Sequence, residues 1–391
     1  MAPRIMLKEL VEIFLGLTHT PEYVQEGVPF LSVKDISNGK IDFSKCNYIT
    51  EEEYNSLPRG AKPQPGDMLF CRVGTIGKPV IIESGTPKFG SFVSLGFFRL
   101  KDTTLCKLEY LYYWMFSDSF YSQVKENVKG ASQINLNTGW LSKFKVPMCS
   151  IEEQEKIIRK LGQIDGLIEL RRKQLNKLDE LVKSRFIELF GDPRINPQGY
   201  EILPISALFD VGSSKRVFES EWRESGVPFY RAREIVKLSK DGFVDNELFI
   251  DEDMYESYKE RYGVPRAGDM MVTGVGTLGI CYIVKETDKF YFKDGNTLWF
   301  KNKGLCDVRF IKDQYETDFV RDQIVANANV STVGTYTITN ANNTMVLVPP
   351  INEQTKYVEF CKQVDKSKLA IQKSLEKLEI LKKSLMQQYF G

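Results

Sequence analysis

The sequence predicts an α+β protein with two mixed α/β domains separated by two long helices that pair as an antiparallel coiled coil. Two observations support this fold class. A heptad pattern of apolar residues runs through the middle of the 391-residue chain and returns at its end. Short motifs in the segments between these patterns also recur in the same order, about 200 residues apart. We therefore expect an internal pseudo-two-fold repeat, with both helices of the coiled coil supplied by one chain.

The first long helix is expected over residues 151–191. Its apolar residues follow each other at steps of three, four and seven, the 3.5-residue period of a helix packed along a partner. They are Leu161, Ile164, Ile168, Leu175, Leu178, Val182 and Leu189. The positions that the pattern skips are charged, Arg171 and Arg185. Residues 351–391 repeat this stretch, including its closing Phe-Gly pair, so the partner helix belongs to the same chain.

Composition speaks against several classes of protein. No run of 18 apolar residues is present, so no membrane span is expected, and the first residues lack the apolar core of a signal peptide. Seven scattered cysteines without a Cys-x-x-Cys pair fit a reducing cytoplasm. A single histidine, His19, argues against His-rich metal sites. The net charge of +1 neither indicates nor excludes nucleic acid, because charge can be segregated by face.

Residues 1–150 indicate a mixed domain. A short helix is expected over residues 7–14, and strands are expected at residues 68–72 and 80–82, on either side of a loop at 74–77. The aromatic-rich stretch 105–129 is expected to be helical. Its Tyr110–Tyr121 part either stacks on bases or, as we favour, packs on the sheet through Leu111, Trp114, Met115 and Phe120.

The same order of motifs returns in the second half. Val-Pro-Phe at 28–30 recurs at 227–229, Gly-Asp-Met at 66–68 recurs at 268–270, Gly-Thr-aliphatic-Gly at 74–77 recurs at 276–279, and Val-Pro at 146–147 recurs at 348–349. The offset drifts slightly, as expected for a duplicated unit whose loops differ in length. The period is far longer than the 20–50 residues of a solenoid repeat. The expected division is therefore two domains, at 1–150 and 192–350, and two helices, at 151–191 and 351–391.

No motif predicts a catalytic, cofactor-binding or metal site. Gly274–Gly279 has the spacing Gly-x-Gly-x-x-Gly, but a dinucleotide site requires this pattern to open a helix, and strand-like residues follow here. A tight turn between strands explains the pattern better. The equivalent loop of the first half is not a phosphate-binding P-loop, because Pro79 stands where Ser or Thr should hold magnesium. We also find no methyltransferase Asn/Asp-Pro-Pro-aromatic loop and no nuclease or zinc pattern.

The polar loops that differ between the halves supply the candidate binding residues. Arg and Lys can grip guanine edges or phosphates, and a small Gly-Thr loop lets a DNA backbone approach closely. For any one residue, surface charge without a role is the alternative. The candidates are Ser32, Lys34, Arg72, Thr75, Lys78, Gln133, Asn135, Ser213, Ser214, Lys215, Arg216, Arg231, Arg233 and Thr277. Arg231 and Arg233 follow the strand equivalent to the one that precedes Ser32 and Lys34, and we expect base contact from one of the two arginines.

Taken together, these features resemble the specificity (S) subunit of type I restriction-modification systems. The resemblance rests on the doubled series Gly-Asp-Met, Gly-Thr-aliphatic-Gly and Val-Pro, followed by Ile-x-Glu-Gln and a leucine-rich helix that ends in Phe-Gly. It covers essentially the whole chain. One departure is that residues 334–336 do not align cleanly with residues 130–133, so loop residues cannot be carried from one half to the other.

The resemblance implies a non-catalytic DNA-recognition subunit. In that family, each variable domain is a target-recognition domain that reads one half of a split, asymmetric DNA sequence. The helices act as a spacer and as docking sites for two methylation (M) subunits, and restriction (R) subunits complete the complex. S-adenosylmethionine, ATP and magnesium then belong to the partner subunits. A helix of 40 residues is about 60 Å long, more than one DNA turn of about 34 Å. A stand-alone DNA methyltransferase and a coiled-coil protein scaffold remain as alternatives.

Overall fold

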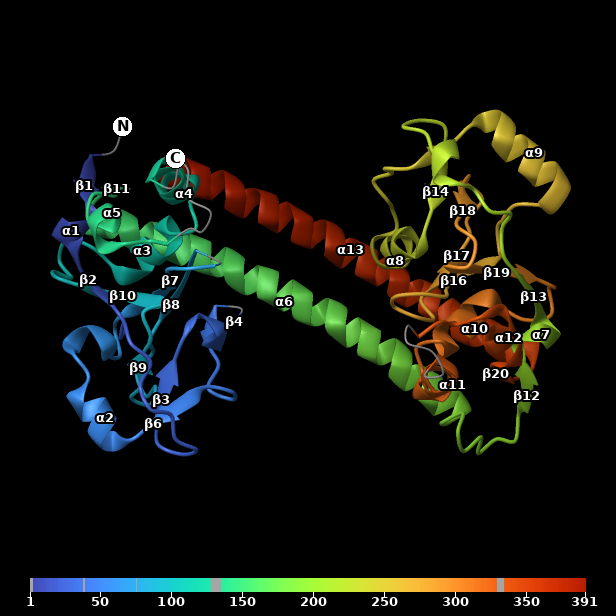
Figure 1. Cartoon of the computed structure of the whole chain (residues 1–391), viewed down its shortest axis with the longest axis horizontal. Coiled ribbons are helices and arrows are strands. Elements are labelled where there is room, and N and C mark those ends of the chain that lie inside the picture. Colours follow the sequence, from blue (N-terminus) through green and yellow to red (C-terminus); the bar gives the residue numbers. More distant parts are fainter. Residues whose placement is uncertain (1–2, 38, 75, 128–134, 329–333) are drawn as a thin grey trace. The chain divides into compact units, whose positions relative to one another are not determined.

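The computed structural model describes residues 3–37, 39–74, 76–127, 135–328 and 334–391 (Figure 1). The chain forms two compact units. Unit 1 comprises Met1–Gln174 together with Ile371–Gly391, and unit 2 comprises Leu175–Ala370. Each unit therefore contains one globular domain and one half of each long helix. Within the described ranges, no helix is both long enough and apolar enough to cross a membrane.

Unit 1 contains short strands and short helices ahead of the first long helix, α6 (Ile151–Phe190). Its strands are β1 (Arg4–Met6), β2 (Val11–Leu15), β3 (Val28–Leu31), β4 (Ile36–Ser37), β5 (Lys40–Ile41), β6 (Asn47–Ile49), β7 (Met68–Cys71), β8 (Gly77–Ile81), β9 (Gly90–Ser91), β10 (Leu95–Leu100) and β11 (Lys145–Pro147). Its helices are α1 (Leu7–Leu10), α2 (Glu51–Ser56), α3 (Leu108–Trp114), α4 (Asp118–Asn127) and α5 (Thr138–Leu141), with 3₁₀ turns η1 (Val33–Asp35) and η2 (Arg59–Ala61).

Unit 2 repeats this order ahead of the second long helix, α13 (Ile351–Phe390). Its strands are β12 (Glu201–Pro204), β13 (Phe209–Gly212), β14 (Val227–Tyr230), β15 (Phe249–Ile250), β16 (Met270–Thr273), β17 (Cys281–Ile283), β18 (Tyr291–Phe292), β19 (Thr297–Asn302) and β20 (Met345–Val348). Its helices are α7 (Ile205–Leu208), α8 (Ala232–Asp241), α9 (Glu252–Tyr262), α10 (Val308–Gln314), α11 (Asp318–Ala328) and α12 (Ile338–Asn343), with the 3₁₀ turn η3 (Glu219–Glu221).

The two units have matching sheets. The larger sheet has the strand order β2-β10-β7-β8 in unit 1 and β13-β19-β16-β17 in unit 2, and all its neighbours are antiparallel. The smaller sheet has the order β6-β3-β9 in unit 1 and β15-β14-β18 in unit 2, with one parallel pair in each, β3 with β9 and β14 with β18. The mixed architecture predicted from the sequence is therefore confirmed, and both halves carry it.

Two predicted elements have different bounds in the structure. The helix expected over residues 7–14 is a single turn, because Val11–Leu15 continues as β2 and pairs with β10. Three β-branched or aromatic residues in Val-Glu-Ile-Phe-Leu favour this strand. The helix expected over 105–129 is broken into α3 and α4 at Ser117, whose hydroxyl donates to Trp114 O. Leu111, Trp114, Met115 and Phe120 are fully buried, as the packing interpretation predicted.

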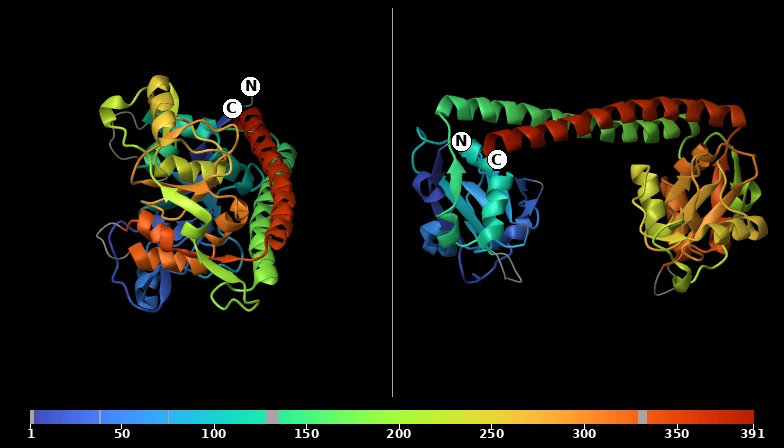
Figure 2. Two further views of the ribbon diagram at one scale, coloured as in Figure 1. Left: turned by 90° about the vertical axis from the view of Figure 1, so that its right-hand side faces the viewer. Right: turned by 90° about the horizontal axis from the view of Figure 1, so that it is seen from above.

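Within each unit, the two long helices run antiparallel (Figure 2). In unit 1, Arg172 pairs with Glu379 at 2.8 Å and Lys382 pairs with Asp165 at 2.6 Å. The residue numbers of α6 therefore fall along the pair as those of α13 rise. In unit 2, Lys368 pairs with Asp179. The antiparallel coiled coil is confirmed.

The closing phenylalanine of each long helix packs into a domain core. The Phe390 ring lies 5.0 Å from that of Tyr110 in unit 1, and the Phe190 ring lies 5.0 Å from that of Phe310 in unit 2. Both phenylalanines are buried. This explains why the Phe-Gly ending recurs, since each ring fills the same place against α3 or α10.

The glutamine of each Ile-x-Glu-Gln motif joins the start of a long helix to its domain. Gln154 is fully buried, and its Oε1 accepts a 2.9 Å hydrogen bond from the backbone N–H of Lys107 while its Nε2 donates to Cys149 O. Gln354 makes the same contacts with the N–H of Asp307 and with Pro349 O. A buried amide with both ends satisfied fixes the angle at which each long helix leaves its domain.

Candidate nucleic-acid interface

The ends of five chain segments converge at one edge of unit 2. β13 and β16 both end where β19 begins, because Gly212 faces Trp299 and Thr273 faces Thr297. β14 and β18 are parallel, so the residues after them also meet, and the chain passes from β18 directly into β19. We call this edge the rim of unit 2. It consists of residues 213–216, 231–233, 274–279, 293–296 and 334–337.

Backbone hydrogen bonds hold the rim of unit 2 together. The N–H of Lys293 donates to Tyr230 O at 2.8 Å, which joins the ends of β14 and β18. The N–H of Gly274 donates to Asn296 O at 2.9 Å, and the N–H of Tyr336 donates to Gly274 O at 2.9 Å. These bonds tie the Gly-Thr-Leu-Gly loop to the segments on both sides of it.

Unit 1 has the same rim, formed by residues 16–19, 32–34, 72–74, 76–78, 92–94 and 135–137. The N–H of Phe92 donates to Leu31 O at 2.8 Å, that of Arg72 to Ser94 O at 3.0 Å, and that of Leu136 to Arg72 O at 3.0 Å. Most of the candidates predicted from the sequence lie on one of the two rims. Thr75 and Gln133 lie outside the described residues.

The last rim segment, 135–137 in unit 1 and 334–337 in unit 2, corrects the sequence alignment of the two halves. Asn137 caps α5 by accepting from the N–H of Trp140, and Thr337 caps α12 by accepting from the N–H of Asn340. The residues just before these caps, Leu136 and Tyr336, bond to equivalent loops. Residues 335–337 therefore correspond to 135–137, and the departure noted in the sequence lies upstream of them.

A carboxylate closes the turn after the first strand of each smaller sheet. In unit 1, the N–H and the hydroxyl of Ser32 donate to Asp35 Oδ2 at 2.7 and 3.0 Å. In unit 2, the N–H of Arg231 donates to Glu234 Oε2 at 2.8 Å, and its guanidinium donates to both carboxylate oxygens at 3.2 and 2.9 Å. Arg231 thus plays the part of Ser32 and stabilises the start of α8.

The second candidate on each turn is more exposed. Lys34 is exposed on η1. The Arg233 side chain is 52% exposed, against 25% for Arg231, and it contacts the carboxylates of Glu234 and Glu247. Lys34 and Arg233 are therefore equivalent cations, two residues after the cap, and both stand at the surface.

Glu234 is the buried centre of this ion cluster. Burial raises its pKa, but hydrogen bonds from Arg231 and Arg233 outweigh that effect, so the pKa of Glu234 lies below its ordinary value. The carboxylate is therefore ionised at neutral pH. Glu247 adds a second, exposed carboxylate, so the two guanidinium groups are balanced by two carboxylates in the cluster.

Arg72 is buried, unlike the other candidates that the structure describes. Its guanidinium donates to Leu136 O and Val93 O, both at 2.7 Å, and to Asn135 Oδ1 at 2.9 Å. Burial lowers the pKa of Arg72, although an arginine stays charged at neutral pH. Arg72 therefore fixes the segment that carries Asn135. The first half places this arginine where the second half has Gly274.

The candidates Ser213–Arg216 lie on a longer connection than exists in unit 1. Phe14 and Gly212 occupy equivalent sheet positions, opposite Phe97 and Trp299. Two residues then separate Phe14 from the buried Leu17, whereas four separate Gly212 from the buried Val217. All four residues of the unit 2 connection are anchored. Ser213 Oγ accepts from Gly295 N, Ser214 Oγ donates to Phe292 O, Lys215 N donates to the Tyr291 hydroxyl, and Arg216 pairs with Asp294.

The Gly-Thr-aliphatic-Gly loops are turns between antiparallel strands, as predicted. β7 pairs with β8 and β16 pairs with β17, so no helix follows the glycines and the dinucleotide interpretation fails. Thr277 is exposed, and its carbonyl accepts from the hydroxyl of Thr273. Lys78, just after the first loop, has a positive φ of 45° and is half-buried.

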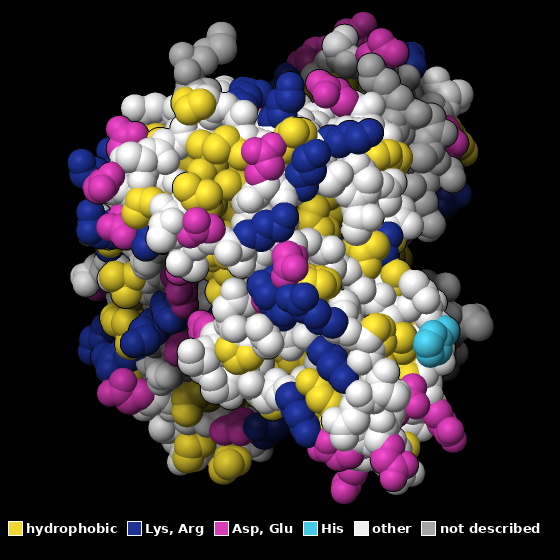
Figure 3. Space-filling view, turned by 90° about the vertical axis from the view of Figure 1, so that its left-hand side faces the viewer, with side chains coloured by type: hydrophobic (Ala, Val, Ile, Leu, Met, Phe, Trp, Pro, Cys, Tyr) yellow, Lys and Arg dark blue, Asp and Glu magenta, His cyan; other side chains and the backbone are white. Residues whose placement is uncertain are grey.

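On one face of the molecule, charges of both signs are mixed (Figure 3). Figure 3 shows Lys and Arg side chains interspersed with Asp and Glu on one face of the molecule. The described residues include no group of three or more His, Cys, Asp or Glu side chains placed to hold a metal ion.

Sequence reasoning missed Lys293 of the unit 2 rim and two carboxylates that contact the rim arginines, Glu234 and Glu247. Lys293 lies on the rim because β18 runs parallel to β14. This pairing could not be predicted, because a strand of only two residues leaves no periodic pattern in the sequence. Glu234 could have been found from the Arg-x-x-Glu spacing ahead of an apolar helix face. Glu247 comes from a loop after α8, and no local signal identifies its contact with Arg233.

Comparison with known proteins agrees with the doubled motifs. Residues 5–180 match the family model described as the type I restriction modification DNA specificity domain. A putative type I restriction enzyme specificity subunit of Haemophilus influenzae is 23% identical over 59% of this chain and 58% of its own length. The MjaIX specificity subunit of Methanocaldococcus jannaschii is 25% identical over 65% of this chain and 63% of its own length. The chain thus spans less than two thirds of either relative.

Solved structures extend the likeness to the whole fold. The S subunit of the type I restriction-modification system of M. genitalium superposes with a TM-score of 0.59 at 15% identity, over 100% of this chain and 96% of that one. A chain from a structure that describes complex assembly and conformational transition of the type I system superposes with a TM-score of 0.61 at 14% identity. This match covers 100% of this chain and 98% of that one. At such low identity these matches establish the fold. Together with the family match, they confirm the resemblance to specificity subunits.

Proposed function

We propose that this chain, a relative of the type I specificity subunits, is the DNA-recognition subunit of a type I restriction-modification complex. Each globular domain reads one half of a bipartite, asymmetric DNA target. The long helices act as the spacer between the domains and as docking surfaces for two methylation subunits. The chain itself is non-catalytic. S-adenosylmethionine, ATP and magnesium belong to the partner subunits, which include the restriction subunits where these are present.

One observation carries this proposal: the same rim is built twice and carries different side chains each time. The backbone bonds that form the rims are equivalent, whereas Ser32 is replaced by Arg231, Lys34 by Arg233 and Phe92 by Lys293. A shared framework with different polar groups is suited to reading two different half-sites. Direct reading of bases depends on the hydrogen-bonding groups that reach the groove, so different rims prefer different bases.

Lys34 and Arg233 are the pair that we assign to DNA contact at the capping turns. They are equivalent and exposed, and neither closes its turn, because Ser32 and Arg231 do so. Arg233 would exchange its exposed partner Glu247 for a phosphate or a guanine edge while Glu234 stays with Arg231. Arg231 then acts as a positioning residue.

Docking of partner subunits is supported by apolar side chains that the coiled coil leaves uncovered. Large aliphatic residues on both long helices are between 44% and 69% exposed, namely Leu167, Leu170, Leu181, Ile187, Leu369, Ile380 and Leu381. Exposed large aliphatic side chains on both long helices supply apolar surface that a partner subunit could bury. A partner that covers them would remove this surface from water.

Methylome sequencing of a host with and without this gene tests the proposal. We expect methylated adenines in a split, non-palindromic motif only when the gene is present with its methylation subunit. As a control, Glu247→Gln leaves the capping turns intact and should preserve the motif. A methylome that does not change when the gene is removed would contradict a role in DNA recognition.

A further inference from the structure

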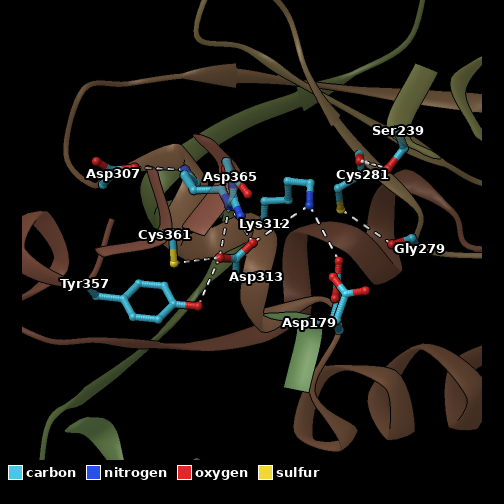
Figure 4. A network of polar contacts seen from close by, with 12 residues as sticks. Asp179, Ser239, Gly279, Cys281, Asp307, Lys312, Asp313, Tyr357, Cys361 and Asp365 are labelled. Atoms are coloured by element: carbon cyan, nitrogen blue, oxygen red, sulfur yellow. Dashed lines mark hydrogen bonds and ion pairs between the residues drawn. The ribbon is translucent and has the colours of Figure 1, made fainter. Parts of the chain in front are cut away.

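Unit 2 contains a cavity of about 610 Å³ behind its Gly-Thr-Leu-Gly loop. It is lined by α8, by the loop between β16 and β17 together with the start of β17, by α10 and α11, and by the turn that joins these two helices. Figure 4 shows Ser239, Gly279, Cys281 and Lys312, which belong to its wall. The volume lies within the range of about 300–1,000 Å³ that is usual for small-molecule sites.

In unit 1, a tyrosine ring occupies the corresponding place. Tyr121 on α4 donates through its hydroxyl to Ile76 O at 3.3 Å, and that hydroxyl lies 3.1 Å from where a Cβ on Gly77 would stand. The equivalent position on α11 is Arg321. The equivalent carbonyl, that of Leu278, and the equivalent glycine, Gly279, line the cavity of unit 2. The replacement of the ring by an arginine thus leaves the space behind this loop without its aromatic occupant.

The wall of the cavity is held in place by its own contacts. Ser239 Oγ donates to Cys281 O at 2.8 Å, which ties α8 to β17, and the Tyr315 ring is buried beside it. Gly279 has a φ of 74°, and a Cβ on it would lie 2.6 Å from Cδ1 of Ile324. Glycine is therefore required at this position, and the loop passes close to α11.

The lining carries more positive than negative charge. Lys312 lies 3.5 Å from Glu316 and 3.8 Å from Asp313, so its ammonium is partly compensated. Arg321 makes no ion pair with any of the described residues, and it lines the same cavity. An anionic group could therefore bind between Lys312 and Arg321 without first breaking an ion pair of Arg321.

We propose that this cavity binds a nucleotide. The base takes the place of the ring that Tyr121 supplies in unit 1, against Gly279 and Ile324, and it donates to the Leu278 carbonyl as the Tyr121 hydroxyl does to Ile76. The phosphate lies on Arg321 and Lys312. The nucleotide has two possible sources, a free mononucleotide or a nucleotide turned out of bound DNA, and both present the same base and phosphate.

Calorimetric titration of the full chain with the four deoxynucleoside monophosphates tests the proposal. We expect saturable binding of at least one of them with one site per chain, and at least tenfold weaker binding of the matching nucleoside, which lacks the phosphate. Arg321→Tyr copies unit 1 and should fill the cavity and abolish binding. Lys312→Gln keeps the cavity open and should weaken binding at least tenfold. Tyr121→Phe, at the equivalent position of unit 1, should leave binding unchanged.

A second arm identifies the source of the nucleotide. Duplexes that contain the mapped target are prepared with the fluorescent base 2-aminopurine at each adenine in turn. Their fluorescence should increase on binding only if the base leaves the stack. If the fluorescence increases, Arg321→Tyr abolishes the increase, and free nucleotides do not bind, then the nucleotide comes from bound DNA. The proposal is overturned if neither arm gives a signal, or if signals persist unchanged in both Arg321→Tyr and Lys312→Gln. Thermal unfolding of each variant verifies that it is folded.

Discussion

Arg231 and Glu234 form a three-bond clasp at the start of α8, with the backbone N–H at 2.8 Å and two guanidinium nitrogens at 2.9 and 3.2 Å. Ser32 and Asp35 form the same clasp in unit 1 with an N–H and a hydroxyl. The side chain of Arg231 therefore stabilises this turn, as the side chain of Ser32 does in unit 1. Arg233 is left as the exposed cation of the turn.

Arg231→Ala should lower the free energy of unfolding by about 1–3 kcal/mol, because it leaves the buried Glu234 with fewer donors. Arg231→Ser, which copies unit 1, should recover part of this loss. Arg233→Ala should change stability less, since its side chain is 52% exposed. Urea denaturation of the three variants measures these differences. Equal losses for Arg231→Ala and Arg233→Ala would contradict the assignment of separate roles.

The same Arg233→Ala variant distinguishes two modes of DNA contact. If Arg233 grips a guanine, its loss should cost about 1–3 kcal/mol at the preferred sequence and relax choice at one base position. If it binds phosphate, affinity should fall for all sequences, and the slope of log affinity against log salt should decrease by about one. An unchanged affinity at every sequence would remove Arg233 from the interface.

The stability of unit 2 should depend on the ionisation of Glu234. Its pKa is lowered in the folded chain from the ordinary value of 4.5, so its ion cluster stabilises the folded state fully above that pH. This contribution is lost as the pH falls through the lowered pKa. Glu234→Gln should therefore lose more stability at pH 7 than at pH 3. Thermal unfolding of both proteins across this range measures the effect, and a constant difference would show that the carboxylate is not stabilised.

Leucines of the coiled-coil seam should differ in importance along its length. Leu161 is fully buried, because α3 packs on the helix pair there, and Leu161→Ala should cost about 2–5 kcal/mol. Leu175 and Leu178 are only half-buried. Their replacement by Ala should cost less than about 2 kcal/mol each, below the value expected for fully buried positions. Denaturation of the single variants compares them, and equal costs would contradict this gradient.

The Gly-Thr-Leu-Gly loop of unit 2 should contact the DNA backbone. Thr277 is exposed at the rim, where its hydroxyl can donate to a phosphate. Thr277→Val keeps the shape and removes the donor, so binding should weaken alike for all sequences. Affinities for the target and for duplexes with single changes measure this. A changed order of preference would instead show that Thr277 reads bases, and no change would leave the loop as a structural turn.

The sequence was sufficient to predict the repeat and the long helices, because both leave periodic signals. The predicted helices 151–191 and 351–391 match Ile151–Phe190 and Ile351–Phe390 to within one residue. The glycine loops were also predicted correctly as turns between strands. These features depend on local chemistry, namely heptad spacing, turn residues and the strand-forming residues after Gly279.

The rims could not be predicted in full, because they are made by pairing between distant segments. Arg72 looked like a surface cation, and only the fold shows that three acceptors enclose it. Likewise, nothing in the sequence around Glu247 indicates that Arg233 contacts it. The short helix expected at 7–14 was wrong beyond Leu10, since pairing with β10 outweighs a weak helical pattern there.

The central claim, that each domain reads its own half of the target, is tested most directly by an exchange of domains. Residues 192–350 are replaced by the same region of a related specificity subunit, and the methylated sequence is mapped by methylome sequencing. One half of the bipartite motif should change, while the half read by residues 1–150 stays the same. A change in both halves, or in neither, would contradict the assignment of one half-site to each domain.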